Sequence, residues 1–525
     1  MKILITDPIE QVCTDILQKE GMQVDAKPGL PADEIKKIIG GYDALIVRSG
    51  TKVTADIISE AQQMKVIGRA GAGVDNIDVS AATRKGIVVM NTPGGNTIST
   101  AEHTMALMMA MARNISQSHH SLQEGKWDRK KYMGTELYGK TLGVIGLGKV
   151  GREVAERAKA FGMSVIGYDP LLAGEMASKL GLETVALEEI FKRSDFITVH
   201  TPLTEETRGI LGEKAFALCK RGVRVINCAR GGIIDEVALL NALESGQVAG
   251  AAFDVFVKEP PVDNPLLKHP KVVATPHLGA STEEAQEKVA KQIGEQLVDF
   301  FKGRGIFGAV NIVDYQTAVS DELRSYLVLA EKIGSLHAQL LNGKIKSINA
   351  SYRGGVLQKS TELLSTALLK GLLDKMMYAP VNFVNASVIA ADMGIVVSET
   401  KEQDGEHYSQ LLTVTVQTDK EERSISGTVF GENELRIVGI DKFHFELVPE
   451  GLLMFYSNID RPGMLAGVGS VLAANRVNIA GMSLGRSAPG EKAITVMSVD
   501  SDIPDSAMQE ISKIEGVFEV KTVKL

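Results

Sequence analysis

The chain has little cysteine. Its 525 residues include three, Cys13, Cys219 and Cys228, and none has the spacing of a metal ligand. It also lacks any run of about eighteen apolar residues and any basic leader before its first apolar run, MKILITDP. The formal net charge is −8, so no overall basic field exists to hold phosphates. We therefore expect a cytoplasmic protein with no structural metal, signal peptide, membrane span or nucleic-acid partner.

Composition and length describe a globular chain with several domains. Hydrophobic residues make up 44% and charged residues 23%, the balance of a folded, soluble protein. A chain of 525 residues is too long for one ordinary domain, and the length favours about three or four.

The first 310 residues alternate short apolar runs with amphipathic stretches, which predicts parallel sheets. Residues 99–123 have apolar side chains at helical spacing and are predicted as one long helix between two such blocks. Residues 281–302 are predicted as a helix that returns the chain to the first block. We expect two doubly wound lobes with a cleft between them. A Rossmann lobe (99–281) would be inserted in a flavodoxin-like lobe (1–98 and 282–310).

The pattern changes beyond residue 313. Residues 315–450 mix helices, predicted at 321–342 and 360–377, with alternating strands, and they contain no catalytic constellation. We expect an α+β domain there. Residues 451–525 follow the order β-α-β-β-α-β, which predicts a ferredoxin-like domain.

A glycine motif opens the second block. Gly146, Gly148 and Gly151 follow a predicted strand and precede a helix predicted at 152–161. The motif alone is also consistent with a glycine-rich turn that binds nothing. However, the next strand ends at Asp169, where a carboxylate meets the adenosine ribose hydroxyls and repels a 2′-phosphate. Together these features predict an NAD site, with the pyrophosphate at the helix N-terminus.

Three further residues follow predicted strands, where open α/β sheets place their ligands. These are Arg230, Glu259 and His277. Oxidation of a 2-hydroxy acid needs a base for the hydroxyl proton, and histidine titrates near neutrality. A carboxylate can hold one ring nitrogen, and a guanidinium matches the substrate carboxylate. Each residue alone is more often structural, and spacing does not show that the three meet.

Four segments, GLGKVG, NCARGGIIDE, AAFDVFVKEPP and TPHLGAST, together resemble the D-isomer-specific 2-hydroxyacid dehydrogenase family in order and spacing. The resemblance covers residues 1 to about 310. It implies that Arg230 orients the substrate, that His277 is the acid/base and that Glu259 partners His277. It also implies the residues that line the cofactor beside the glycines and Asp169: Lys149, Val150, His200, Thr201, Pro202, Cys228, Ala229, Arg230, Asp254, His277, Gly279 and Ala280.

Other segments resemble the branch of this family that acts on 3-phosphoglycerate: VRSGTKVT, GRAGAGVDNID, NTPGGNTISTAEH and KWDRKKYMGTEL. This resemblance implies NAD-dependent oxidation to 3-phosphohydroxypyruvate, the first step of L-serine biosynthesis. A substrate with a phosphate and a carboxylate needs several cations. Arg129 is similar to a residue that reaches the site from a neighbouring subunit, although Lys130 or Lys131 could take that role, or the run could be a solvated helix end. The expected substrate contacts are Arg48, Ser49, Arg69, Gly71, Asn96 and Arg129.

The C-terminal extension also has relatives. Residues 315–450 resemble the allosteric-substrate-binding type of intervening domain, and NIDRPGMLAGVGSVLAANRVNIAGM resembles an ACT domain, an amino-acid sensor. The resemblance implies that Asp460, Gly463 and Asn478 hold an L-serine effector across a paired interface, in a homodimer or homotetramer. Asn458 departs from the pattern because a tyrosine can occur there in serine-responsive relatives. The alternative is a tail that serves assembly alone.

Two rival functions remain open from the sequence. The first is another enzyme of the family, such as a glyoxylate or hydroxypyruvate reductase, which would not need Arg48, Arg69 and Arg129 together. The second is a dehydrogenase-like corepressor that binds NAD and docks peptides, which the ACT-like tail disfavours. The family resemblance also allows a side activity that reduces 2-oxoglutarate.

Overall fold

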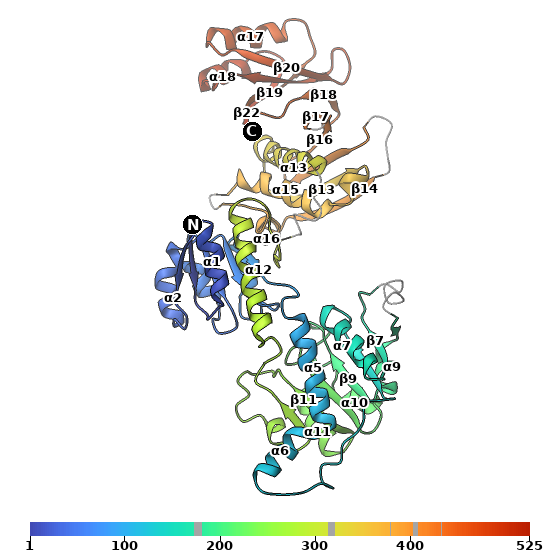
Figure 1. The fold of residues 1–525 in the computed structure, drawn as a ribbon. Helices are drawn as coiled ribbons and strands as arrows, with labels where there is room; N and C mark the ends of the chain where they lie inside the picture. The colour runs from blue at the N-terminus through green and yellow to red at the C-terminus, as the bar shows by residue number, and fades with distance from the viewer. Residues whose placement is uncertain (173–180, 313–320, 378–379, 403–407, 432) are drawn as a thin grey trace.

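The computed structural model describes residues 1–172, 181–312, 321–377, 380–402, 408–431 and 433–525. Within these residues, four sheets follow one another along an elongated molecule (Figure 1). The N-terminal lobe and the glycine-motif lobe lie next to each other, and the two C-terminal sheets extend beyond the N-terminal lobe.

The first lobe is built on a parallel sheet with the order β2-β1-β3-β4-β5, the flavodoxin-like order. Helix α12 packs against α1, and its Val289, Ile293 and Leu297 share one buried core with Ile3 and Val66. This packing returns the chain to the first lobe, as predicted. The elements are β1 (Lys2–Ile5), α1 (Gln11–Lys19), β2 (Gln23–Ala26), α2 (Ala32–Ile38), β3 (Ala44–Val47), α3 (Ala55–Glu60), β4 (Val66–Arg69), α4 (Val79–Arg84), β5 (Val88–Met90) and α12 (Glu283–Phe301).

The second lobe has a parallel sheet with the order β12-β11-β10-β9-β6-β7-β8, the doubly wound order of a dinucleotide-binding fold. Its central strands, such as β6 and β9, are buried on both faces, as parallel strands usually are. The elements are α5 (Thr97–Ala112), α6 (Ile115–Gln123), β6 (Thr141–Ile145), α7 (Lys149–Ala160), β7 (Ser164–Tyr168), β8 (Glu183–Thr184), α9 (Leu187–Arg193), β9 (Phe196–Val199), α10 (Glu213–Leu218), β10 (Val223–Asn227), α11 (Glu236–Glu244), β11 (Val248–Phe253) and β12 (Val272–Ala274).

The prediction of one long helix over residues 99–123 is wrong. Helix α5 ends at Ala112 and α6 begins at Ile115. Asn114 between them has a φ of 51°, in the left-handed region that asparagine tolerates better than most residues. The apolar spacing continues across this break, so periodicity alone did not reveal it.

The intervening region is α+β. Its sheet has the order β14-β13-β15-β16-β17-β18, parallel only between β13 and β14. Helices α13 and α15 pack closely at Gly334, which has no side chain in the way. A Cβ at this position would lie 2.1 Å from the carbonyl oxygen of Leu368. The elements are α13 (Asp321–Leu340), β13 (Ile345–Arg353), α14 (Gly355–Gln358), α15 (Thr361–Asp374), α16 (Ala386–Asp392), β14 (Val396–Glu402), β15 (Leu411–Thr418), β16 (Glu422–Phe430), β17 (Glu434–Ile440) and β18 (Phe443–Leu447).

The C-terminal sheet has the order β20-β21-β19-β22, with two helices between its strands. The predicted ferredoxin-like arrangement is confirmed. Buried side chains from α17 and α18, such as Val468 and Ile511, pack on Met454 and Met497 of the sheet. The elements are β19 (Leu452–Ile459), α17 (Met464–Ala474), β20 (Ile479–Arg486), β21 (Lys492–Val499), α18 (Asp505–Ser512) and β22 (Val517–Lys524).

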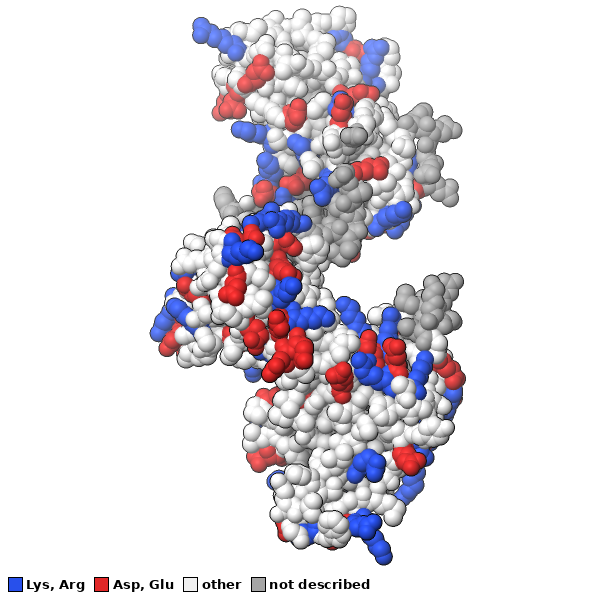
Figure 2. All heavy atoms as spheres, viewed as in Figure 1, with Lys and Arg blue, Asp and Glu red and all other residues white. Residues whose placement is uncertain are grey.

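Charges of both signs are interspersed on the surface. Figure 2 shows Lys and Arg as well as Asp and Glu on each lobe of the face in view, separated by uncharged areas. That face therefore presents positive and negative charges together and not an electrostatic field of one sign. Among the described residues, no helix combines the length and apolar character needed to cross a membrane. In the same residues, no group of three or more His, Cys, Asp or Glu side chains is placed to hold a metal ion.

Candidate active site

The glycine loop between β6 and α7 has the form that dinucleotide binding requires. Gly146 has a φ of 94°, and a Cβ on it would lie 2.6 Å from the carbonyl oxygen of His200. A Cβ on Gly151 would lie 2.0 Å from the oxygen of Gly146, so α7 packs directly on the loop. A Cβ on Gly148 would meet no atom within 4 Å. The first and third glycines thus serve the fold, while the second leaves open space at the start of α7.

Asp169 lies beside this loop, directly after β7. Its Oδ2 accepts the backbone N–H of Leu147 at 2.8 Å, and its Oδ1 accepts that of Leu171 at 2.9 Å. These two bonds fix the carboxylate next to the glycine loop, where a ribose would bring its hydroxyls.

The segment facing Gly146 offers unused polar atoms. Nδ1 of His200 and Oγ1 of Thr201 are buried without a hydrogen-bond partner in the described part of the chain. Burial lowers the pKa of His200 to about 4, so the ring is neutral near pH 7. Unpaired buried polar atoms are costly unless a ligand satisfies them, so this wall fits a polar cofactor such as NAD.

Cys228 and Ala229 follow β10 on the same side of the sheet. Burial raises the pKa of the Cys228 thiol to about 12, which keeps it uncharged. The N–H of Ala229 donates to Oδ1 of Asn227 at 3.0 Å, which holds the loop that leads to Arg230.

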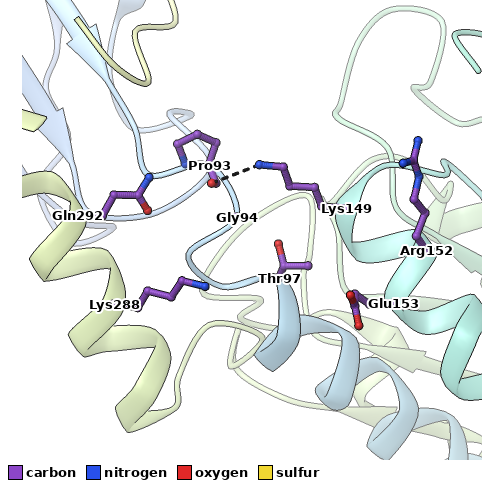
Figure 3. Close-up of a pocket in the computed structure, with 8 residues that line it drawn as sticks. All are labelled: Pro93, Gly94, Thr97, Lys149, Arg152, Glu153, Lys288 and Gln292. Atoms are coloured by element: carbon purple, nitrogen blue, oxygen red, sulfur yellow. Dashed lines mark hydrogen bonds between the residues drawn. The ribbon is translucent and has the colours of Figure 1, made fainter. Parts of the chain in front are cut away.

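A cavity of about 590 Å³ lies where α7, α5 and α12 come together (Figure 3). Helices α5 and α7 both begin at this cavity, with Thr97 and Lys149 as their first residues. Nζ of Lys149 donates to the carbonyl oxygen of Pro93 at 3.4 Å, and Lys288 approaches from α12. Two helix N-termini and lysine side chains make the cavity electropositive beside the glycine loop, which suits the phosphates of a dinucleotide.

His277 and Glu259 form a hydrogen-bonded pair. Nδ1 of His277 lies 2.8 Å from Oε2 of Glu259, and Oε1 of Glu259 accepts the N–H of Phe256 at 3.0 Å. Burial alone would raise the pKa of Glu259, but the hydrogen bonds from His277 and Phe256 lower it overall. The ionised carboxylate requires a hydrogen on Nδ1, so in the neutral ring Nε2 is left as a base.

The turn that carries His277 is wrapped around Asp254. His277 has a φ of 56°, in the left-handed region, and its N–H donates to the backbone oxygen of Asp254 at 2.9 Å. The N–H of Leu278 donates to Oδ1 of Asp254 and that of Gly279 to Oδ2, at 2.7 and 2.8 Å. Burial alone would raise the pKa of Asp254, but these bonds and those from His103 and Thr275 lower it. This carboxylate therefore holds an unfavourable backbone conformation in place.

Arg230 bridges the two lobes. Its Nε donates to Oδ2 of Asp75, in the first lobe, at 2.9 Å. A Cβ on Gly73 would lie 1.8 Å from Nη2 of Arg230, so the guanidinium lies against the glycine backbone of the GRAGAG segment. Arg230 is thus placed at the junction between the lobes.

Arg69 lies within electrostatic range of both Arg230 and Arg48. Burial is the main cause that lowers the pKa of Arg69 to about 10, and the positive charges of Arg230 and Arg48 contribute in the same direction. Nε of Arg69 donates to Oδ1 of Asn76 at 2.8 Å, and a Cβ on Gly71 would lie 2.7 Å from Nη1 of Arg69. Cations that repel one another in this way favour an anionic ligand.

The remaining expected substrate residues outside the arginine cluster are Ser49, Asn96 and Arg129. Ser49 is exposed next to Arg48, and Asn96 precedes α5 without a side-chain bond to the helix start. Arg129 is exposed on the segment after α6, which lies at the end of its lobe away from the first lobe (Figure 1). In this single chain, Arg129 does not join the arginines of the first lobe.

The three expected effector residues lie at two opposite ends of the C-terminal sheet: Asp460 and Gly463 follow the end of β19, whereas Asn478 precedes the start of β20, which runs parallel to β19. Oδ2 of Asp460 accepts a hydrogen bond from Nη1 of Arg486 at 2.8 Å, and Nδ2 of Asn478 donates to Oδ2 of Asp500 at 2.6 Å. Gly463 has a φ of 92° at the start of α17. Asn458 is buried, and its Oδ1 has no partner among the described residues.

Comparison with known families matches three parts of the chain to family models. Residues 105–279 match the family model of the D-isomer specific 2-hydroxyacid dehydrogenase NAD binding domain. Residues 322–441 match the D-3-phosphoglycerate dehydrogenase intervening domain, and residues 452–516 match the ACT domain.

Full-length relatives agree with these models. The D-3-phosphoglycerate dehydrogenase of Archaeoglobus fulgidus is 45% identical over 528 residues, covering 100% of both chains. That of Methanocaldococcus jannaschii is 44% identical over 526 residues, again covering 100% of both. The chain belongs to the D-3-phosphoglycerate dehydrogenase family. The predicted family and its oxidoreductase class are confirmed.

The solved structures agree with the fold of the dehydrogenase lobes. An NAD-dependent formate dehydrogenase from Staphylococcus aureus in complex with NAD is 28% identical, with a TM-score of 0.55, and the match covers 60% of this chain and 100% of that one. NAD as the cofactor of this D-3-phosphoglycerate dehydrogenase family member is likewise confirmed. The predicted α/β fold with an ACT domain is also confirmed.

The structure adds three residues that the sequence did not single out in this member of the D-3-phosphoglycerate dehydrogenase family. Asp75 pairs with Arg230 across the lobes, and His103 and Thr275 both contact Asp254. Asp75 lies in the GRAGAGVDNID segment and Thr275 begins the TPHLGAST segment, so both stand within segments that carried the resemblance. His103 is the last residue of the NTPGGNTISTAEH segment, but that resemblance gave it no role.

Proposed function

We propose that this chain catalyses the NAD-dependent oxidation of 3-phosphoglycerate to 3-phosphohydroxypyruvate, the first step of L-serine biosynthesis. One observation carries the proposal: the His277–Glu259 pair, with its ring nitrogen directed by a carboxylate at 2.8 Å, lies in the lobe that carries the glycine loop, and Arg230 joins that lobe to the arginines of the first lobe. The full-length relatives named D-3-phosphoglycerate dehydrogenase support the choice of substrate.

His277 would act as the base. Its Nδ1–H donates to Glu259, so Nε2 is available to accept the proton of the substrate C2 hydroxyl. Glu259 then stabilises the imidazolium that forms. The nicotinamide of a bound NAD would supply the acceptor for the hydride that leaves C2. In the reverse direction, the protonated His277 returns the proton to the carbonyl oxygen.

Arg230 would hold the substrate carboxylate. Its Nε donates to Asp75 and its Nη1 to the carbonyl oxygen of Ala229, while Nη2 lies against the Gly73 segment, where a carboxylate next to C2 would bind. We assign Arg48 and Arg69, with Ser49, the Gly71 backbone and Asn96, to the phosphate end of the substrate. These cations support a phosphorylated substrate over glyoxylate or hydroxypyruvate.

The cofactor assignment follows the glycine loop. Gly146, Gly148 and Gly151 with Lys149 and Val150 would hold the pyrophosphate, and Asp169 the adenosine ribose. The cofactor wall would be completed by His200, Thr201, Pro202, Cys228, Ala229, Asp254, Gly279 and Ala280.

A spectrophotometric assay of NADH formation tests the function. We expect turnover with 3-phosphoglycerate, and at least about 100-fold lower kcat/KM with D-glycerate or D-lactate, because these lack the phosphate that Arg48 and Arg69 would bind. Replacing both arginines with methionine should narrow this difference. Equal turnover of all three substrates by the native chain would contradict the proposal and favour a reductase of unphosphorylated acids.

The domain bounds that we propose are 1–98 with 282–310 for substrate, 99–281 for NAD, 315–450 for the intervening domain and 451–525 for the ACT domain. The packing of α12 on α1 supports the discontinuous first domain.

The protein would be a homodimer or homotetramer. Large apolar side chains are exposed on α6 and the segment after it, among them Trp127 (76%), Met133 (81%) and Tyr138 (77%). Apolar groups gathered in this way are typical of a covered interface. A partner docked there would bring Arg129 to the neighbouring active site. Sedimentation of the native chain and of Met133→Glu tests the interface, since the charged variant should dissociate.

The ACT domain is a small-molecule effector module, and we propose L-serine as its ligand. Across a paired interface, Asp460 and Gly463 of one chain and Asn478 of the second copy would hold the amine, carboxylate and hydroxyl of serine. Millimolar serine should lower the rate of the native enzyme, and Asp460→Ala should remove this response without changing the uninhibited rate. An unchanged rate in serine would leave assembly as the role of the tail.

We place the enzyme in the cytoplasm. All three cysteine thiols are free and buried, which is the usual state in a reducing compartment.

A further inference from the structure

The turn that carries His277 is supported from beneath by helix α5. Thr100 and His103 lie one turn apart on this helix, and both contact the turn. Oγ1 of Thr100 donates to the carbonyl oxygen of Gly279 at 3.1 Å. Nε2 of His103 lies 3.0 Å from Oγ1 of Thr275 and 3.2 Å from Oδ1 of Asp254.

The hydrogen-bond inventory decides which way the His103 bond runs. The Thr275 hydroxyl donates its only hydrogen to Oδ1 of Asp254 at 2.6 Å, so its oxygen can only accept from His103. The ionised carboxylate of Asp254 also accepts only. Both atoms in front of His103 Nε2 are therefore acceptors, and this nitrogen must carry a hydrogen.

Asp254 transmits this bond to the catalytic turn. It is 1% exposed, and its oxygens accept the N–H groups of Leu278 and Gly279, the two residues after His277. Because His277 adopts a φ of 56°, its backbone position depends on these bonds. A rotation of the Asp254 carboxylate would move the turn and shift the imidazole relative to the substrate.

We infer that His103 is a positioning residue of the active site, which donates a hydrogen bond to Asp254 and Thr275 and thereby sets the placement of His277. His103 touches neither substrate nor cofactor in this assignment. Helix α5 begins directly after Asn96, where the chain passes from the first lobe to the second. The same helix thus links the connection between the lobes to the catalytic turn. The inference rests on the proposed function of His277.

Side-chain length provides the test. The amide nitrogen of glutamine lies the same number of bonds from Cα as Nε2 of histidine, whereas that of asparagine lies one bond closer. We expect His103→Leu and His103→Asn to lower kcat by about 10- to 100-fold, since a displacement of about 1 Å can cost this much. His103→Gln should retain most of the native kcat. The KM for 3-phosphoglycerate should stay nearly native in all three, because Arg48, Arg69 and Arg230 are untouched.

Two controls separate positioning from folding. NAD binding and thermal unfolding are measured on each variant, and the glutamine and asparagine variants keep the test open if His103→Leu does not fold. His444→Leu removes an exposed histidine from β18 of the intervening domain and should match the native enzyme. Asp254→Asn combined with His103→Leu should lose no more kcat than Asp254→Asn alone, because both changes act on one contact.

The outcomes are distinct. Native kcat in all three His103 variants would overturn the inference, as would equal losses in the glutamine and asparagine variants or additive losses with Asp254→Asn. A loss of kcat in the leucine and asparagine variants that glutamine restores would support it. Failure of the native chain to form NADH from 3-phosphoglycerate would instead overturn the proposed function.

Discussion

The Glu259→Gln substitution tests the catalytic pair most directly. In the native structure both carboxylate oxygens accept a hydrogen bond, Oε2 from His277 and Oε1 from the N–H of Phe256. Glutamine has a single acceptor oxygen. If that oxygen faces Phe256, its NH₂ group faces His277 and forces the proton onto Nε2, so the neutral ring can no longer accept the substrate proton. If it faces His277, the NH₂ group opposes the Phe256 N–H.

The size of the effect follows from this conflict. The substitution also removes the negative charge that stabilises the imidazolium. We expect kcat to fall by about 10²- to 10⁴-fold, which corresponds to about 3 to 5 kcal/mol of transition-state stabilisation at ~1.4 kcal/mol per decade. The pair is 47% and 37% exposed at its side chains, so solvent partly compensates and the lower half of this range is the firmer expectation.

Steady-state NADH formation and NAD binding are the two measurements. Binding should be nearly native, since Glu259 is not part of the proposed cofactor wall. Glu205→Gln provides a matched control, because it makes the same chemical change at an exposed glutamate of the same lobe. A Glu259→Gln enzyme within about threefold of native kcat would refute the assignment of His277 as a base directed by Glu259.

Three further predictions concern other parts of the molecule. Gly148→Ala should leave thermal unfolding nearly unchanged but weaken NAD binding about tenfold or more, as calorimetry would show, because its Cβ enters open space at the start of α7. Gly151→Ala should instead destabilise the fold by about 1–3 kcal/mol, measured by urea unfolding, because its Cβ would lie 2.0 Å from a carbonyl oxygen; equal behaviour of the two variants would contradict this division. Asp75→Asn should raise the KM for 3-phosphoglycerate about fivefold, or about 1 kcal/mol, since it frees Arg230 from its partner across the lobes; an unchanged KM would rule out this role. Burial lowers the pKa of His337 from 6.5 to about 3. The stability that its neutral form contributes is therefore complete above pH 6.5 and is lost as the pH falls toward 3. In His337→Gln the free energy of unfolding should fall less steeply with acid, by up to about 1.4 kcal/mol per pH unit; a slope identical to that of the native chain would argue against this titration.

Local sequence patterns predicted much of the architecture. Alternating apolar runs predicted the parallel sheets, and the β-α-β-β-α-β order predicted the C-terminal sheet. Both predictions work because the spacing of apolar residues within a short segment reflects which of its side chains are buried. The same local view failed at Asn114, where one left-handed residue divides a helix whose apolar spacing continues. It also missed β2, a four-residue edge strand, QVDA, with little apolar content.

The glycine loop was predictable for a similar reason. Gly146, Gly148 and Gly151 act within a single turn, so their spacing in the sequence is enough to predict the shape of the loop. Asp169 follows at the end of the next strand. The expected pairing of His277 with Glu259 depended on the family resemblance, and the 2.8 Å contact agrees with it.

By itself, then, the sequence determined the fold class, the glycine loop and the family, because each depends on residues that are close in the chain. Tertiary structure decided which side chains meet: Arg230 with Asp75 over 155 positions, and His103 with Asp254 over 151. Such contacts arise from the docking of one lobe on another and of α5 beneath a distant turn. No local pattern encodes these pairings, since a motif can mark Arg230 or Asp254 without showing which distant residue it will contact.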